Sequence, residues 1–234
     1  MAVVRVLSAG AAQAVVEKIA DAFRRETGNE VRADFGAVGA MRARVTGGEA
    51  VDVIVLTRAL IEELASGGYV TPGTGADLGT VGTGVAVRKG GALPDVASAQ
   101  ALRASLLAAG TVVCPDPAIA TAGKVVMRML ERLDIAVQVK PRMQYFPNGY
   151  AAMKWLAASA EPRAIGITQI TEILANNGVS HVGPLPAELQ MKTVYTAGLA
   201  AQAPAPEAAR EFISRLVAPA ARPMLAEAGY KFED

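Results

Sequence analysis

Two residue types that build many active sites are almost absent, since the 234 residues hold one cysteine, Cys114, and one histidine, His181. A lone cysteine excludes an internal disulfide, and one cysteine with one histidine is too few for a Cys/His structural zinc site. A Ser-His-Asp or Cys-His catalytic arrangement would have to use His181, which lies in NNGVSHVGPLP beside no nucleophile motif. We expect an ordinary loop or strand-edge histidine there, and neither a metal site nor a cofactor.

The sequence also lacks an excess of charge and a long apolar run. Lysine and arginine number 23 against 22 aspartates and glutamates, which gives no electrostatic footprint for nucleic acid or an anionic membrane. No apolar run approaches the about 18 residues of a membrane-spanning helix, and MAVVRVL does not read as a secretory signal. We expect no nucleic-acid partner and no membrane insertion, with a periplasmic location if an export signal was removed and a cytoplasmic one otherwise.

What the sequence does contain is an alternation of short apolar runs with helical patterns. The first apolar run is rich in β-branched residues, and the helical pattern after it stops at Thr27-Gly28-Asn29. Such an alternation predicts an open, mostly parallel α/β sheet. The expected elements of the first part are strand 3–7, helix 14–25, strand 30–36, a short helix that ends at Gly47-Gly48, strand 51–57 and helix 58–65.

The alternation breaks in the glycine-rich stretch 67–84, which we interpret as a linker or a solvated turn, and then resumes. We predict two lobes, residues 1–82 with 196–234 and residues 83–195, joined by two crossings that form a hinge with a cleft between the lobes. The expected elements of this part are strand 85–90, helix 98–108, strand 110–116, helix 123–133, strand 136–143, helix 149–158, strand 164–168, strand 193–202, helix 206–216 and helix 219–228.

Two nucleotide-binding motifs fail when they are tested. The glycines from Gly73 to Gly79 have one residue too many for G-x-G-x-x-G and follow no strand. Gly123-Lys124 resembles the end of a phosphate-binding loop, but Val125 replaces the Ser/Thr that would hold magnesium. The sequence therefore does not predict a nucleotide site.

Five of the expected strand-to-helix turns are made of small residues. A helix start exposes unpaired backbone N–H groups and a partial positive charge, so several that meet at one edge form an anion site with few basic side chains. In open α/β sheets, ligands bind at the carboxyl ends of the strands, where all five turns lie. We therefore predict an anion site built from the turns 10–13, 36–40, 57–58, 120–124 and 147–150.

The order of these motifs resembles the type II periplasmic solute-binding proteins, in particular their molybdate-binding branch. Residues 7–57 are similar to that branch's strand, small-residue turn, helix ending at Thr-Gly, Phe-Gly-x-x-Gly and Asp-Val strand. Residues 114–133 resemble its Asp-Pro helix entry, 145–173 its Pro-Asn and Gly-Ile segments, and 206–230 its C-terminal helix pair. The resemblance covers nearly the whole chain and implies a two-lobe fold with a hinge of two crossover strands, an interlobe cleft, and an ABC transporter permease as a candidate partner.

The sequence departs from that branch where hydroxyls are expected. The branch usually has a serine in the first turn and another in the second, where this chain has Ala11 and either Ala37 or Val38, and it often has a tyrosine where Gln169 stands. A dehydrated dianion needs many donors, because each missing charge-assisted hydrogen bond costs about 1.5 to 3 kcal/mol. We therefore favour a small organic di- or tricarboxylate over molybdate or tungstate.

The residues expected to hold this anion are the small and polar ones of the five turns. Backbone N–H groups and neutral side chains would carry most of its charge, and the arginines offer a fork that matches a carboxylate. The candidate ligand-binding residues are Ala11, Ala12, Gln13, Val38, Gly39, Arg42, Thr57, Arg58, Thr121, Ala122, Asn148, Gly149 and Gln169.

Two functions from different classes remain open. The first is a transport-type solute-binding protein, in which hinge closure traps the anion. The second is implied by a relative of this branch, a cofactor-independent isomerase of an unsaturated tricarboxylate such as aconitate. No catalytic residue is assigned, although Lys124 is a weak candidate for the base, with Asp116 and Glu49 behind it. A ligand-sensing domain of a transcription regulator is less favoured, because no helix-turn-helix pattern precedes Met1.

Overall fold

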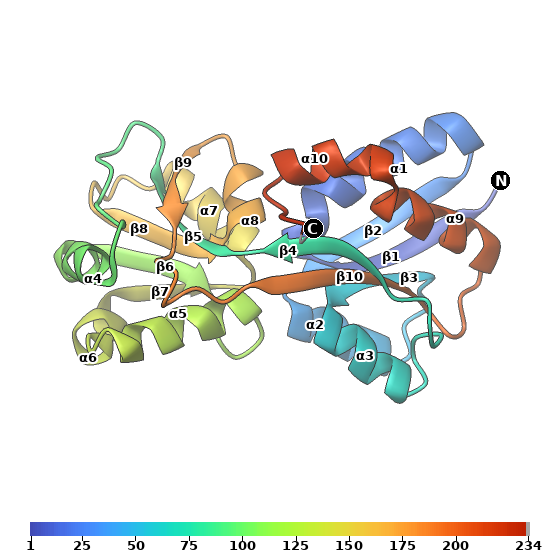
Figure 1. Ribbon diagram of the computed structural model, residues 1–234, viewed down its shortest axis with the longest axis horizontal. Coiled ribbons are helices and arrows are strands. Elements are labelled where there is room, and N and C mark those ends of the chain that lie inside the picture. The colour runs from blue at the N-terminus through green and yellow to red at the C-terminus, as the bar shows by residue number, and fades with distance from the viewer. Residues whose placement is uncertain (233–234) are drawn as a thin grey trace. The chain divides into compact units, whose positions relative to one another are not determined.

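The computed structural model describes residues 1–232, and its chain forms two compact units (Figure 1). Unit 1 contains Met1–Val81 and the chain from Thr193 onward, and unit 2 contains Gly82–Lys192. The chain therefore passes from one unit to the other twice, after Val81 and after Lys192. Each unit has one five-stranded mixed sheet with helices on both faces, which confirms the predicted α/β class.

Unit 1 is built on a sheet with the strand order β2-β1-β3-β10-β4. Strands β2, β1 and β3 are parallel, whereas β10 is antiparallel to both β3 and β4. In Figure 1, α1, α9 and α10 cover one face of this sheet, and α2 and α3 cover the other. The elements are β1 Val3–Ala9, the 3-10 turn η1 Gly10–Ala12, α1 Gln13–Thr27, β2 Glu30–Gly36, α2 Val38–Thr46, β3 Val53–Thr57, α3 Arg58–Ser66, β4 Ala76–Val81, β10 Thr193–Leu199, α9 Pro206–Val217, η3 Pro219–Ala221 and α10 Arg222–Glu227.

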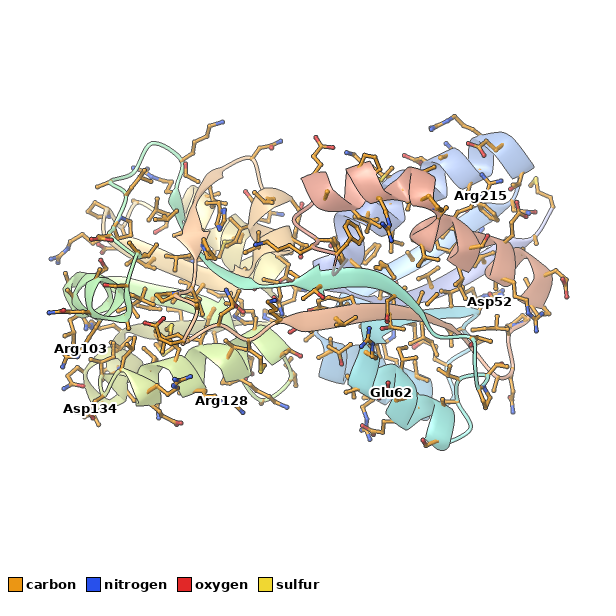
Figure 2. The ribbon with its side chains drawn as sticks, viewed as in Figure 1. Asp52, Glu62, Arg103, Arg128, Asp134 and Arg215 are labelled. Carbon is orange, nitrogen blue, oxygen red and sulfur yellow. The ribbon has the colours of Figure 1, made fainter. Side chains whose placement is uncertain are left out.

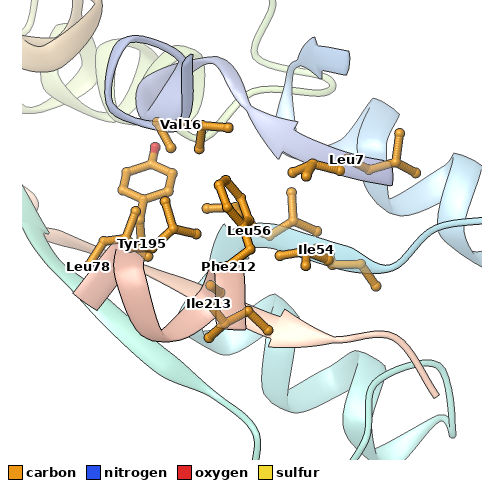
Figure 3. Close-up of a cluster of buried hydrophobic side chains, with 14 of the residues drawn as sticks. Leu7, Val16, Ile54, Leu56, Leu78, Tyr195, Phe212 and Ile213 are labelled. Atoms are coloured by element: carbon orange, nitrogen blue, oxygen red, sulfur yellow. The ribbon is translucent and has the colours of Figure 1, made fainter. Parts of the chain in front are cut away.

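The core of unit 1 forms where α1 and α9 pack on the sheet. Phe23 of α1 meets Phe212 of α9 edge to face, with ring centroids 5.4 Å apart. Gly28 ends α1 with φ 73°, a left-handed conformation that suits glycine because it has no Cβ. The buried hydrophobic cluster that contains this contact includes Leu7, Val16, Ile54, Leu56, Leu78, Tyr195, Phe212 and Ile213 (Figure 3).

The glycine-rich stretch contains a strand that the sequence did not predict. β4 lies at an edge of the unit 1 sheet, and its Leu78 is fully buried. β4 is held by β10, which lies more than 100 residues away in sequence, and by two backbone bonds of 2.8 Å between Thr80 and Lys231. Gly79 has φ 133° and lets the Lys231 backbone approach closely. The interpretation as a linker or solvated turn was therefore wrong for residues 76–81, because partners distant in the chain stabilise this strand.

Unit 2 has the strand order β7-β6-β8-β5-β9, in which β7, β6 and β8 are parallel and β5 is antiparallel to β8 and β9. Helices α4, α5 and α6 cover one face with one buried cluster, and α7 and α8 cover the other with a second cluster. The elements are β5 Thr83–Arg88, α4 Ala99–Ala108, β6 Thr111–Pro115, α5 Thr121–Arg132, α6 Ala136–Val139, η2 Lys140–Arg142, β7 Met143–Phe146, α7 Gly149–Ala158, β8 Ala164–Gln169, α8 Ile170–Leu174 and β9 Val179–Pro184.

The strand predicted over 136–143 is wrong in its first part, which forms α6 and η2 before β7 begins at Met143. Val137, inside the predicted strand, is 84% exposed. Ile135 and Val139 are both fully buried, and their separation of four residues is the spacing of a helical turn. Packing against the unit 2 core therefore outweighed the weak preference of valine for strands.

Within residues 1–232, every helix is too short or too polar to cross a lipid bilayer.

Candidate functional site

The carboxyl ends of three parallel strands lie along one edge of the unit 1 sheet. β2, β1 and β3 are neighbours, and each is followed directly by a helical turn. This edge is the usual place for a ligand in an open α/β sheet. The structure brings to it the predicted residues Ala11, Ala12, Gln13, Val38, Gly39, Thr57 and Arg58.

The helix starts at this edge have no side-chain caps. The N-cap residues of α1, α2 and α3 make no side-chain cap hydrogen bond within residues 1–232. Ala12 and Ala37 stand at the N-cap positions of α1 and α2, where alanine offers no acceptor, and both are at most 6% exposed. By contrast, Ser98 caps α4, with its Oγ 3.1 Å from the Ala101 N–H. Buried and uncapped helix starts leave backbone donors for an anion.

Tyr230 fixes the first of these turns, a role that the sequence did not reveal. Its hydroxyl donates a hydrogen bond of 3.2 Å to the Ala11 carbonyl, and its ring packs edge to face on Tyr195. This bond ties the Ala11 carbonyl to the C-terminal segment. Residues 206–230 resemble the family's C-terminal helix pair, but nothing in their spacing indicates a contact with a turn 219 residues away.

The two arginines predicted to bind the solute are paired with carboxylates of the chain. Arg42 donates to Glu63, with Nε 2.8 Å from Oε1, and Arg58 donates to Asp77. Both pairs are largely exposed, so each adds only about 0 to 1 kcal/mol. A solute carboxylate would therefore have to exchange partners with Glu63 or Asp77 before either guanidinium could bind it.

Asp77 anchors Arg58 to the sheet edge. Its Oδ1 accepts a hydrogen bond of 2.6 Å from the Thr196 hydroxyl in addition to the Arg58 contact. Partial burial acts to raise the pKa of the Asp77 carboxyl, but the hydrogen bonds from Arg58 and Thr196 outweigh it and hold this pKa below its ordinary value. Asp77 is therefore ionised near neutral pH and keeps the guanidinium on this edge.

Unit 2 repeats the arrangement at the carboxyl ends of β7, β6 and β8. The start of α5 has no side-chain cap within residues 1–232, and its N-cap residue is the buried Ala120. Gly123 allows α5 to press on the end of β6, because a Cβ there would lie 2.4 Å from the Pro115 carbonyl oxygen. The structure brings Thr121, Ala122, Asn148, Gly149 and Gln169 to this edge.

The start of α7 differs from the other starts because its donors are already used. The Asn148 side chain accepts from the Ala151 N–H at 2.8 Å, and the Gly149 N–H donates to Glu172 at 3.1 Å. Glu172 is buried and also accepts a hydrogen bond of 2.5 Å from the Thr168 hydroxyl. Asn148 and Gly149 therefore lie at the predicted edge, but their polar groups serve the unit itself.

Burial raises the pKa of the Glu172 carboxyl, although hydrogen bonds from Thr168 and from nearby backbone N–H groups oppose the shift. A carboxyl whose pKa is higher in the folded state than in the unfolded state binds more protons when folded, so stability falls as the pH rises above the ordinary glutamate pKa. We expect Glu172→Gln, which is neutral at every pH, to lose this part of the pH dependence of the free energy of unfolding. Urea unfolding between pH 4 and 8 measures this dependence. Glu131→Gln, a change at an exposed position of the same unit, should show the pH dependence of the wild type. An unaltered slope of unfolding free energy against pH in Glu172→Gln would contradict the expectation.

Basic side chains near the start of α5 take part in no ion pair of the described chain. The ion pairs found within residues 1–232 all lie in unit 1, so none of them includes Lys124 or Arg128 of α5. Figure 2 labels Arg128 on this helix. Lys124 is exposed in the first turns of the helix. A cation near a helix N-terminus is unfavourable by itself, but it adds to the attraction for an anion there.

The other candidate acids and bases are placed differently. Glu49 follows the end of α2 and precedes β3, so it lies at the opposite end of the sheet from the β2–α2 turn, and it pairs with Arg44. Asp116 closes a local turn by accepting from the Ala118 N–H at 2.8 Å.

Burial raises the pKa of the Cys114 thiol to about 12, with a smaller contribution from Asp116, so this cysteine is not a nucleophile. His181 lies in the edge strand β9, as expected.

Comparison with known proteins places these features in a family. The model of the family described as bacterial extracellular solute-binding protein matches residues 4–231. Among curated proteins, an aconitate isomerase of a Pseudomonas species is 27% identical over 237 residues, which covers 97% of this chain and 86% of that protein.

Solved structures share the fold. The periplasmic molybdate-binding protein of Azotobacter vinelandii has a TM-score of 0.83 and 22% identity, with 99% of this chain and 100% of that chain covered. The sulfate-binding protein of Mycobacterium tuberculosis has a TM-score of 0.77 and 18% identity, with 100% of this chain and 88% of that chain covered. At these identities the likeness shows the fold, and the ligand has to be argued from the residues of this chain.

Proposed function

Because the chain belongs to the family of bacterial extracellular solute-binding proteins, we propose that it binds a small organic di- or tricarboxylate at uncapped helix starts. The observation that carries the proposal is the row of uncapped helix starts on β1, β2 and β3, with buried alanines where side-chain acceptors usually stand. The finer assignments, namely a permease partner and a place outside the cytoplasm, follow from the family and belong to this proposal.

An organic anion fits these turns better than a tetrahedral oxyanion. Ala11, Ala12 and Ala37 are buried and supply backbone N–H groups with apolar methyl surface but no hydroxyl. A hydrocarbon chain can lie against those methyl groups, whereas molybdate needs a donor on every side and would leave several charge-assisted bonds unmade. The curated relative named for aconitate, a tricarboxylate, points to the same class of solute.

The test is a thermal-shift and calorimetric screen of citrate, tricarballylate and trans-aconitate against molybdate and sulfate. A bound carboxylate at 100 times its Kd should add about 2.7 kcal/mol of stability. Ala37→Asp places a carboxylate at the α2 N-cap, where it would occupy the donors itself, so the affinity for a carboxylate should fall at least about tenfold. Ala43→Asp puts the same charge on an exposed position of the same helix and should leave the affinity within about twofold. Stabilisation by molybdate alone would refute the proposal.

An aconitate-type isomerase is the second candidate, and the 27% identity to such an enzyme over 97% of the chain favours it. The reaction moves one proton from one carbon to another as the double bond shifts, so the atoms balance without a cofactor. Lys124 is the basic side chain placed at the start of α5, and an acid-base role for it is part of this candidate only. A proton NMR time course with trans-aconitate decides between the two functions, since a receptor leaves its solute unchanged.

A further inference from the structure

Two buried threonine hydroxyls of unit 2 have no hydrogen-bond partner. Thr83 is fully buried and Thr171 is 4% exposed. Among residues 1–232, neither Oγ1 atom has a hydrogen-bond partner. Buried hydroxyls are almost always bonded, so an exception indicates a ligand or a water molecule at that position.

The sheet register places Thr83 beside the predicted site residue Gln169, whereas Thr171 lies in the first turn of α8, which begins directly after Gln169. Thr83 is the partner of Gln169 across the antiparallel ladder of β5 and β8, so these two side chains project from the same face. Thr171 follows Gln169 by two residues, and the Ile170 N–H between them donates to the Gly82 carbonyl at 2.9 Å. Thr83 follows Gly82 and Thr171 follows Ile170, so the two threonines are next in the chain to the two residues that this hydrogen bond joins.

The same register relates Thr83 to the uncapped start of α5. Val85 and Ile167 are paired on β5 and β8 and pack in the cluster that contains Val125 of α5. Thr83 and Gln169 lie two residues further along their strands, so they continue the face that α5 covers. They do so at the carboxyl end of β8, the edge at which α5 begins after the neighbouring parallel strand β6.

We propose that Thr83 and Thr171 are solute-contacting residues that donate hydroxyl hydrogen bonds to a carboxylate held at the α5 start of unit 2. They would supply hydroxyl donors of a kind that the alanines at the unit 1 helix starts, Ala11 and Ala37, do not have. This inference rests on the proposed carboxylate function and adds two residues that neither the turn motifs nor the family resemblance singled out. Gln169 and the α5 N–H groups would complete the donor set.

The test separates a solute contact from a structural one by measuring free and bound protein. Thr83→Val and Thr171→Val keep the shape of the side chain and remove the hydroxyl. Because that hydroxyl has no protein partner in residues 1–232, the Tm without solute should stay the same or rise. The Kd for tricarballylate, a saturated tricarboxylate that cannot be isomerised, should rise roughly ten- to hundredfold in each variant.

Two control variants make the result specific. Thr168→Val removes a buried hydroxyl that is bonded to Glu172, so its Tm without solute should fall clearly. Thr83→Ser keeps the hydroxyl and should bind tricarballylate within about threefold of the wild type. A Kd within twofold of the wild type in both valine variants would overturn the inference. So would a loss of Tm as large as that of Thr168→Val, since it would show that the hydroxyl bonds only a buried water.

The failure of the proposed function gives a different result. If the wild type binds molybdate and no carboxylate, the carboxylate function is wrong, and titration of the same variants with molybdate still decides whether Thr83 and Thr171 contact the anion. If the wild type binds none of the probes, both the function and the contact are refuted.

Discussion

Replacing Asp52 by alanine is expected to lower the free energy of unfolding by about 4 kcal/mol. Asp52 is fully buried at the start of β3 (Figure 2). Its Oδ2 accepts from the Arg5 N–H of β1 at 2.7 Å, and its Oδ1 accepts from the Ala205 N–H at the start of α9 at 2.6 Å. The change leaves two backbone donors without an acceptor, and each such buried donor costs about 1 to 3 kcal/mol.

Urea unfolding followed by circular dichroism measures this loss, with Asp34→Ala as the matched control. Asp34 is an exposed carboxylate of the same unit that pairs with Arg44, so its removal should cost less than about 1 kcal/mol. Asp52→Asn has the shape of the wild type but turns an NH2 group toward one of the two donors, so it should fall between the other variants. Equal stability of the Asp52 and Asp34 alanine variants would show that the buried bonds contribute nothing.

Gly149→Ala is expected to cost about 3 kcal/mol, although the change adds one methyl group. A Cβ at this position would lie 1.9 Å from Oε2 of Glu172 and 2.0 Å from Oγ1 of Thr168. Neither group can move away without breaking the hydrogen bond between them or the bond from Gly149 to Glu172. Thermal and urea unfolding of the purified variant provide the measurement.

A double-mutant cycle identifies the cause of that loss. Glu172→Ala removes the carboxylate that the new methyl group would strike, and by itself it should destabilise the protein because the Thr168 hydroxyl and nearby backbone N–H groups lose their acceptor. The double variant should then be more stable than the sum of the single losses predicts, by roughly 1 to 3 kcal/mol. Additive losses would mean that Gly149 is required for another reason than its contact with Glu172.

The elements that were predicted correctly are those with a strong local signal. The helix from Gln13 to Thr27 shows apolar residues at helical spacing and a glycine stop, and α5 and α9 show the apolar spacing without a glycine stop. The parts that were missed depend on partners far away. β4 is held by β10 and by the segment at Lys231, and a sequence window around its glycines contains no trace of either.

The candidate site also has a part that the sequence predicted and a part that depends on contacts distant in the chain. The small residues of the strand-to-helix turns were visible in the sequence, and they predicted helix starts without side-chain acceptors at Ala11, Ala12 and Ala37. The hydrogen bonds that side chains make inside each unit could not be predicted from the sequence. The bond between Gly149 and Glu172 spans 23 residues, and only the fold shows that it consumes a donor at the α7 start.

The sequence by itself determined the α/β class, the family resemblance and the absence of hydroxyls from the first two turns, because periodicity and residue identity are local properties. Only the tertiary structure decided which donors and hydroxyls have partners. Asp52 meets Ala205 across 153 residues, Tyr230 meets Ala11 across 219, and Thr83 lies beside Gln169 through the register of an antiparallel ladder. Such pairings are set by the packing of the whole unit, because a buried polar group takes its partner from whatever element the core places next to it.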